Sequence, residues 1–174
     1  RAFSTFNKVK DFGDCYYIDK VISPADTALL YGKRQSREYI MSKVKEDLIF
    51  ACENCLTSGP NIHTDGRIYI NRYVALAMAS RIFLYEGTFR KYHSLTIDPA
   101  TAGVETVNDY RFYLTEAASA AEEIMNDGPY KLYSTGNPDK DYRMLFAQED
   151  ASKDEFILAV YYNHPAGIYN NSTA

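Results

Sequence analysis

One apolar segment constrains the fold of this chain more than any other feature. The segment begins after a turn signal at Asp65-Gly66 and runs from Asn71 to Gly87. Its small residues are Ala75, Ala77, Ala79 and Ser80, and its large ones include Met78, Ile82, Phe83 and Tyr85. Small side chains on a helix let a neighbouring backbone approach closely, and large ones fill the grooves between helices. The segment therefore predicts a helix packed tightly against other helices.

Capped amphipathic segments predict the remaining long helices. The predicted helices span residues 36–57, 71–87 and 106–127, with a helix at 1–12 and a short one that starts at Asp139 or Asp141. Their expected N-caps are Ser36, Asn71 and Asn108, and the expected stops are Gly59-Pro60, Gly87 and Gly128-Pro129. In the predicted helix 36–57, Ile40, Val44 and Leu48 recur at helical spacing and form one apolar stripe. A β-branched and aromatic run at 155–163, EFILAVYYN, predicts one short strand near the C-terminal end.

The small face of the segment 71–87 needs a partner. Helix 106–127 offers small residues at Ala117, Ala118 and Ala121, so we expect the two helices to pack face to face. Arg81 and Glu86 are then expected to face water. Large, small and aromatic residues followed by Gly87-Thr-Phe89 match the first helix of a tetratricopeptide hairpin. The alternative is an alanine-rich helix that is simply buried.

Two features depart from a regular tetratricopeptide array. Tyr92 stands where the repeat prefers a small residue, and residues 93–105 interrupt the hairpin. We therefore predict a mainly α fold with tetratricopeptide-like helical hairpins, antiparallel long helices and little strand.

Composition excludes several classes of protein. The chain has 174 residues, 46% of them hydrophobic and 24% charged, which fits one globular unit with a real core. Its net charge is −4 and its Lys and Arg residues are scattered, so a nucleic-acid partner is not expected. No apolar run approaches the roughly 20 residues needed to cross a bilayer. The chain opens on Arg1 in mid-pattern, so we expect it to be a piece of a larger protein.

Metal, redox and catalytic motifs are incomplete. Cys52-Glu-Asn-Cys55 lies at the end of a predicted helix, where the helix dipole does not lower a thiol pKa. We expect both thiols to pack along the apolar stripe, with no metal and no cofactor. The three histidines, His63, His93 and His164, are expected on the surface. Asn137-x-Asp139-x-Asp141 resembles the start of a calcium loop but lacks the later ligands, so helix capping by an Asp is the better interpretation.

Five motifs, in order, resemble the SusD/RagB family of nutrient-binding proteins. They are RAFSTFNKVKDFGDCYYID, KRQSREYIMSKVKEDLIFA, GRIYINRYVALAMASRIFLYEGTF, AEEIMNDGPYKLY, and the tail DYRMLF with DEFILAVYY. The second is similar to the family pattern RxSREEVYxxIxxDLxxA, and the third to GRxTKxAAxALLARVYLYxG. The resemblance covers nearly the whole chain. It departs from the family at Cys15-Tyr16, where Val-Pro is preferred, and in the longer loop 93–105.

The resemblance implies a non-catalytic protein on the surface of Bacteroidota-type bacteria. Such a protein captures a polysaccharide or oligosaccharide, or a peptide in the RagB branch, and partners a TonB-dependent SusC-type outer-membrane transporter. It is held at the outer membrane by a lipid anchor, here expected outside residues 1–174. These residues would form a single SusD-like α–α superhelical fragment, with more of the protein on both sides.

No motif identifies the ligand-binding residues directly. A flat tyrosine ring stacks well on a pyranose, and Tyr16, Tyr17, Tyr92 and Tyr169 lie in predicted loops or turns. Tyr169 and Asn170, which follow the predicted strand, are the candidate ligand-binding residues. Two other functions stay open: an intracellular tetratricopeptide-type adaptor that binds peptides, and an all-α glycoside hydrolase, although no carboxylate pair is recognisable.

Overall fold

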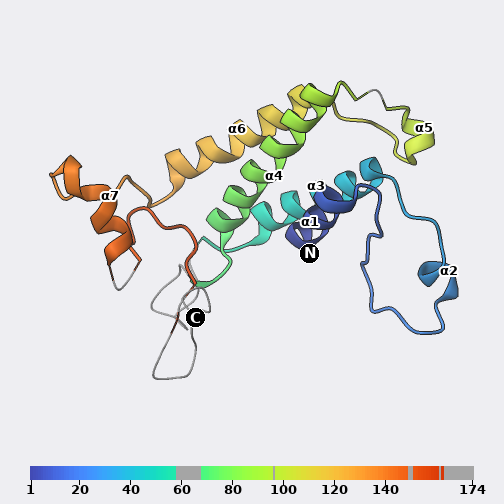
Figure 1. Ribbon diagram of the computed structural model, residues 1–174, viewed down its shortest axis with the longest axis horizontal. Helices are drawn as coiled ribbons and strands as arrows, with labels where there is room; N and C mark the ends of the chain where they lie inside the picture. The colour runs from blue at the N-terminus through green and yellow to red at the C-terminus, as the bar shows by residue number, and fades with distance from the viewer. Residues whose placement is uncertain (58–67, 96, 149–150, 161, 163–174) are drawn as a thin grey trace.

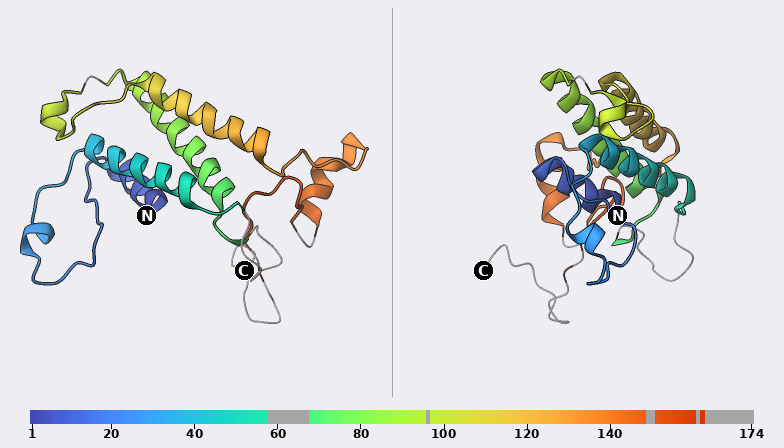
Figure 2. Two further views of the ribbon diagram at one scale, coloured as in Figure 1. Left: turned by 180° about the vertical axis from the view of Figure 1, so that it is seen from behind. Right: turned by 90° about the vertical axis from the view of Figure 1, so that its right-hand side faces the viewer.

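The structure is mainly helical. The computed structural model describes residues 1–57, 68–95, 97–148, 151–160 and 162. Its helices are α1 (Ala2–Phe12), α2 (Thr27–Leu30), α3 (Arg37–Asn54), α4 (Arg72–His93), α5 (Pro99–Ala102), α6 (Tyr110–Asp127) and α7 (Pro138–Ala147). Helices α1, α3, α4 and α6 pack in that order, each against the next, while α7 lies apart at the far end of α6 (Figures 1 and 2). The prediction of a mainly α fold is confirmed.

The predicted strand at 155–163 is wrong where the structure describes it. Residues 155–160 and 162 are in no strand, and residues 161 and 163 lie outside the described part. Nearby, the Lys131 amide donates to the Asp154 carbonyl at 2.8 Å, and the Phe156 amide to the Ser152 carbonyl at 3.2 Å. A β-branched and aromatic run fits a pleated surface, but it becomes a strand only beside a partner strand. Within the described residues this run has none.

Side-chain caps fix where the long helices begin. Ser36 Oγ accepts from the Tyr39 amide at 3.2 Å, and Asn71 Oδ1 accepts from the Val74 amide at 3.0 Å. Both predicted caps are confirmed. Helix α6, predicted at 106–127, starts later than predicted. Asp109 rather than Asn108 caps it and accepts from the Phe112 amide at 2.9 Å.

Gly87 does not end α4, contrary to the prediction. The helix continues to His93 and ends at Ser94, whose φ of 48° is left-handed. A Cβ added at Gly87 would lie 2.8 Å from Leu114 Cδ2 and 3.1 Å from the Tyr110 carbonyl oxygen. A glycine inside a helix costs about 1 kcal/mol relative to alanine, but only glycine allows this close approach. Gly87 therefore serves the contact between α4 and α6.

The small face of α4 packs against α6, as predicted, but with a different set of alanines. Ala79 is buried, and Ser80 Oγ donates to the Ala117 carbonyl of α6 at 2.9 Å. On α6, Ala117 and Ala120 are buried whereas Ala118 is exposed. A helix advances 100° per residue, so residues three apart share a face and the neighbour of Ala117 turns outward.

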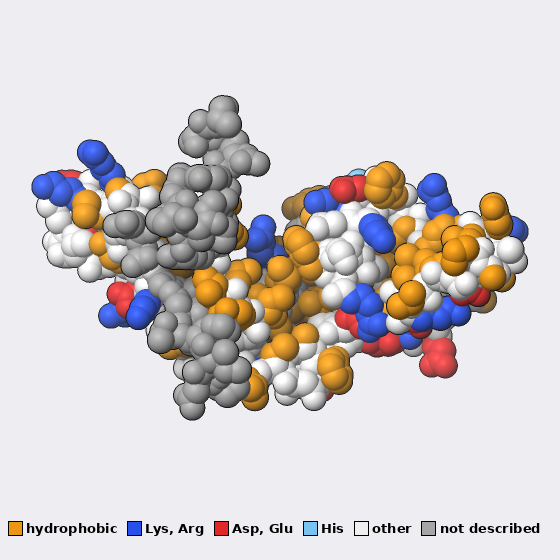
Figure 3. All heavy atoms as spheres, turned by 90° about the horizontal axis from the view of Figure 1, so that it is seen from below, with side chains coloured by type: hydrophobic (Ala, Val, Ile, Leu, Met, Phe, Trp, Pro, Cys, Tyr) orange, Lys and Arg blue, Asp and Glu red, His pale blue; other side chains and the backbone are white. Residues whose placement is uncertain are grey.

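A long loop between α1 and α3 forms a separate feature of the surface. This α2 loop, residues 14–35, is closed at its base by two backbone hydrogen bonds between Cys15 and Gln35, at 3.2 and 3.0 Å. Val21 and Tyr31 are 97% and 86% exposed. Apolar side chains gather at the end of the molecule that carries this loop, with Lys and Arg along their border (Figure 3). Among the described residues, no helix is both long and apolar enough to span a membrane.

The α4–α6 contact leads to the first prediction. We expect Ser80→Leu to lower the free energy of unfolding by about 1–3 kcal/mol, because the added methylenes enter the contact with α6 and the hydrogen bond to the Ala117 carbonyl is lost. Arg81→Leu is the matched control on the same helix. Its side chain is exposed, so the change should stay within about 0.5 kcal/mol. Thermal unfolding of both variants measures the difference, and equal small effects would contradict the interface.

Candidate functional site

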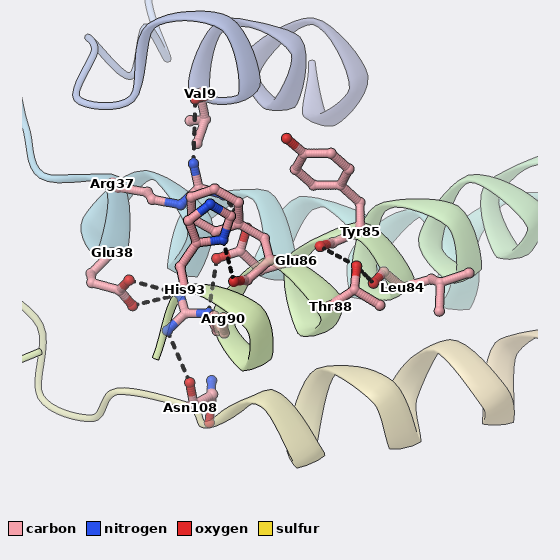
Figure 4. Close-up of polar contacts among 11 residues, drawn as sticks. Val9, Arg37, Glu38, Leu84, Tyr85, Glu86, Thr88, Arg90, His93 and Asn108 are labelled. Atoms are coloured by element: carbon pink, nitrogen blue, oxygen red, sulfur yellow. Dashed lines mark hydrogen bonds and ion pairs between the residues drawn. The ribbon is translucent and has the colours of Figure 1, made fainter. Parts of the chain in front are cut away.

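A buried group of charged residues lies where four segments of the chain meet. We call Arg37 and Glu38 of α3, together with Glu86 and Arg90 of α4, the Arg–Glu cluster (Figure 4). Sequence reasoning placed Glu86 in water, and that prediction is wrong because its side chain is 0% exposed. The signal in the sequence is Glu86 and Arg90 four residues apart, a spacing that favours an ion pair on one helix face.

Arg90 is the centre of the cluster. Its Nη2 atom donates to both carboxylate oxygens of Glu38 at 2.8 and 2.7 Å, and its Nε donates to Glu86 Oε1 at 2.8 Å. Its Nη1 atom donates to the Asn108 carbonyl just before α6, at 3.0 Å. One guanidinium thus joins α3, α4 and the start of α6. No other cation has this geometry, because only guanidinium presents five donors in a rigid plane.

Arg37 extends the cluster to α1. It donates to the second oxygen of Glu86 and, at 3.4 Å, to the Val9 carbonyl of α1. Its guanidinium carbon lies 4.1 Å from the centre of the Phe89 ring, and that of Arg90 lies 4.8 Å from the centre of the Tyr113 ring. Two cations and two anions balance in formal charge, and aromatic rings cover the cations.

The electrostatics and hydrogen bonds fit a structural cluster. Burial by itself lowers the pKa of Arg90, but the charges of Glu86, Tyr113 and Glu38 and the hydrogen bond to Glu38 raise it above its ordinary value. Burial raises the pKa of Tyr113 to about 12. All four carboxylate oxygens and all three nitrogens of Arg90 have partners within the protein, whereas the buried Nε of Arg37 has none among the described residues. The cluster therefore holds the fold rather than a ligand.

A smaller polar contact joins the N-terminal residue to α3. Arg1 Nε donates to Asp47 Oδ2 at 2.7 Å, and the Tyr17 hydroxyl donates to the same oxygen at 3.2 Å. Burial alone would raise the pKa of Asp47, but the hydrogen bonds and the positive charge of Arg1 lower it below its ordinary value. This contact also explains Tyr17, which the sequence placed among possible ligand-binding tyrosines.

Two hollows are candidates for binding. The first, here the connection pocket, lies between the end of α4 and the start of α6 and has a volume of about 470 Å³. Its lining is Arg90, Leu95, Ile97, Pro99, Glu105, Thr106, Val107, Asn108, Asp109 and Tyr110. Arg90 is engaged in the cluster and Asp109 in the helix cap, so the half-buried Tyr110 and the exposed Glu105 are the groups best able to meet a ligand.

The second hollow, here the α4 groove, lies over α4 between α3 and α6 and has a volume of about 200 Å³. Residues of α3 that line it are Leu48, Ile49, Cys52 and Glu53; those of α4 are Arg72, Leu76, Ala79 and Phe83; those of α6 are Glu116, Ser119, Ala120 and Glu123. At one end Arg72 donates to Glu123 and, through Nε at 2.9 Å, to the Cys52 carbonyl. Neither hollow is predicted by the sequence.

Of the tyrosines considered for ligand binding, those that the structure describes, Tyr16, Tyr17 and Tyr92, line neither hollow. Tyr169 and Asn170 lie outside the described residues. The hydroxyl of Tyr16 donates to the Gly32 carbonyl and closes the α2 loop, so this tyrosine has a structural role. Tyr92 is 77% exposed on α4.

The predictions for Cys52 and His93 are confirmed, and those for the other cysteine and the other histidines are not. Cys52 packs against the core from the α4 groove, as expected, whereas Cys55 is the half-buried residue that caps α3. His93 is exposed at the end of α4 and stacks on Phe89 at 4.2 Å between ring centres. His63 and His164 lie outside the described residues.

The calcium-like motif at 137–141 makes local hydrogen bonds with the chain just before it. The predicted capping by an Asp is wrong, because Asn137 occupies the cap position of α7, without a side-chain cap hydrogen bond, and Asp141 accepts from the Thr135 amide at 2.8 Å. These hydrogen bonds from Thr135 hold the pKa of Asp141 below its usual value. In the described part of the chain, no three His, Cys, Asp or Glu residues are grouped so that they could hold a metal ion.

Comparison with protein-family models, with curated proteins and with solved structures found no match to this chain.

The Arg–Glu cluster predicts a large effect from a single change. Glu86→Ala leaves Arg37 and Arg90 short of a buried counter-charge, so we expect the free energy of unfolding to fall by about 3–5 kcal/mol. Glu86→Gln keeps the side-chain volume, so its free energy of unfolding should lie between those of Glu86→Ala and the wild type. The control is Glu46→Ala, since Glu46 forms an exposed pair with Lys43 and should matter by at most about 1 kcal/mol. Chemical denaturation measures all three, and a small effect at Glu86 would contradict the role of the cluster.

Cys52 yields a prediction about reactivity. Burial, followed by the negative charge of Glu123, raises the pKa of its thiol to about 11. At pH 8 the reactive thiolate is then about 100-fold scarcer than for a thiol of ordinary pKa near 9. In a variant with Cys15→Ser and Cys55→Ser, iodoacetamide should modify Cys52 about 100-fold more slowly than it modifies free cysteine. A rate that saturates near neutral pH would contradict this environment.

Proposed function

We propose that the chain belongs to a non-catalytic, cell-surface nutrient-binding protein of the SusD/RagB type. In this proposal the helices form tetratricopeptide-like hairpins, α1 with α3 and α4 with α6. A lipid anchor outside these residues holds the protein at the outer membrane, where it delivers a glycan, or a peptide, to a TonB-dependent SusC-type transporter.

The observation that carries the proposal is the way the resembling motifs meet. Arg37 of the second motif pairs with Glu86 of the third motif, and Glu38 of the second motif pairs with Arg90, just beyond the third. Arg1 of the first motif pairs with Asp47 of the second. Motifs that resemble a family by sequence thus contribute interacting side chains to one helical scaffold. This supports a common structural reason for their order.

The connection pocket supports a ligand-binding role. Its volume of about 470 Å³ falls within the roughly 300–1,000 Å³ typical of pockets for small molecules. Tyr110 offers an aromatic ring, and Glu105 a carboxylate able to accept hydrogen bonds from sugar hydroxyls. Leu95, Ile97 and Val107 supply apolar walls. A pyranose, with one apolar face and several hydroxyls, suits this combination.

The test is binding by the full-length protein. A glycan array identifies the sugar, and Tyr110→Ala should then weaken its binding by about tenfold or more, a loss of roughly 1.4 kcal/mol. Tyr92→Ala, which removes an exposed tyrosine outside the pocket, should leave the affinity unchanged. A thermal melt checks that both variants fold equally. Equal affinities for the two variants would remove the pocket from the proposal.

A second measurement separates the nutrient-binding protein from an intracellular adaptor. Under the proposal, the full-length protein co-purifies from outer membranes with a β-barrel transporter and carries a lipid on its N-terminal cysteine. Recovery of an unlipidated protein from the cytosol would favour the adaptor, and hydrolysis of a bound polysaccharide by the pure protein would favour a glycoside hydrolase.

A further inference from the structure

We propose that the α4 groove is a docking site for a basic peptide segment of a partner protein, which inserts one apolar side chain and places a Lys or Arg beside it. The inference does not rest on nutrient binding, because it concerns a different surface from the connection pocket. It follows from the apolar floor of the groove, the charge of its rim and its size.

The floor of the groove is apolar and preformed. Leu76, Ala79 and Phe83 of α4 form its base, and Leu48 of α3 and Ala120 of α6 stand on either side. All five are buried, so their positions are fixed by the helix packing. An apolar side chain that covers this floor gains hydrophobic contact without reorganising the protein.

The rim carries uncompensated negative charge. Glu53 of α3 and Glu116 of α6 have no ion pair within the described part of the chain, while Glu123 is paired with Arg72. Burial is the main cause of the high pKa of the Cys52 thiol; Glu123 and Glu53 raise it further, and Arg72 lowers it. A cationic partner is favoured here, and an anionic one is repelled.

The size of the groove limits what it can hold. Its volume of about 200 Å³ is below the roughly 300–1,000 Å³ of typical small-molecule pockets. Its base on α4 extends from residue 72 to residue 83, a length of roughly 17 Å at 1.5 Å per residue. A short stretch of peptide that inserts one or two side chains matches an elongated hollow of this small volume better than a compact ligand does.

Lysine and arginine suit both parts of the surface. The aliphatic stem of either residue can lie on the apolar floor while its charged head reaches a carboxylate on the rim. Hydrogen bonds between such a head and a carboxylate are charge-assisted and about twice as strong as neutral ones. Glu53 and Glu116 lie on opposite walls, so a peptide with two basic residues can engage α3 and α6 together.

A labelled peptide tests the proposal on the full-length protein. The probe is an amphipathic peptide of about 12 residues made of Leu and Lys, long enough to cover the groove as a helix. Fluorescence anisotropy should detect binding that weakens with added salt, because exposed charges are screened. The same peptide with Glu in place of Lys should not bind, and one with Ser in place of Leu should bind at least tenfold more weakly.

Matched variants locate the site. The double variant Glu53→Lys/Glu116→Lys should weaken binding of the Leu–Lys peptide at least tenfold. Its control, Glu46→Lys/Glu122→Lys, makes the same charge change on the same two helices at exposed positions outside the groove. Ser119→Trp should block the groove, whereas Thr115→Trp, also exposed on α6 but outside the lining, should not.

Each result supports or overturns the proposal. Equal binding by both charge variants, or by the Leu–Lys and Leu–Glu peptides, overturns it. The α2 loop itself exposes Tyr31 next to Lys33 and Arg34, so a second copy of the chain is another possible occupant. Dimers in sedimentation velocity that disappear in Glu53→Lys/Glu116→Lys would replace the partner by a second copy. Glycan binding should persist in the Glu53→Lys/Glu116→Lys variant. Failure of the wild-type protein to bind any glycan would count against nutrient binding but not against peptide docking.

Discussion

The rest of the structure depends on the ion pairs and hydrogen bonds that the guanidinium of Arg90 makes. It is buried and hydrogen-bonded to Glu38, Glu86 and the Asn108 carbonyl. Removing any of these acceptors would leave part of a cation unpaired in an apolar surrounding, which is costly. The three segments that supply the acceptors are therefore held in one relative position. Arg37 extends the same constraint to α1 through the Val9 carbonyl.

Helix α4 extends this constraint because its different faces contact α1, α3 and α6. Gly87 and Ser80 allow close contact with α6. Glu86 and Arg90 join α4 to α3, and Phe6 of α1 packs edge-on against Tyr85 at 5.4 Å between ring centres. The face that remains, with Leu76 and Phe83, is the floor of the α4 groove. One helix thus positions both the charged cluster and the surface that we propose binds a peptide.

The two hollows lie at opposite ends of the α4–α6 pair and differ in chemistry. The connection pocket forms at the end of α4 and is large enough for a small polar ligand. The α4 groove begins near Arg72, at the other end of the helix, and is smaller and acidic at its rim. Because rigid helices separate them, a ligand in one need not disturb the other, and variants can test each hollow independently.

The sequence alone determined the helices, their caps at Ser36 and Asn71, and the small face of α4, because these features depend on residues close together in the chain. It did not determine what the polar residues inside those helices do. Glu86 looked like a surface residue because its charge favours water, and only Arg37 and Arg90 at contact distance make its burial favourable. Gly87 looked like a helix end because glycine usually breaks helices, and only the approach of Leu114 gives it another reason. The strand predicted at the C-terminal end likewise depended on a partner that local sequence cannot supply. Pairing between distant segments, which the tertiary structure decides, set the role of each of these residues.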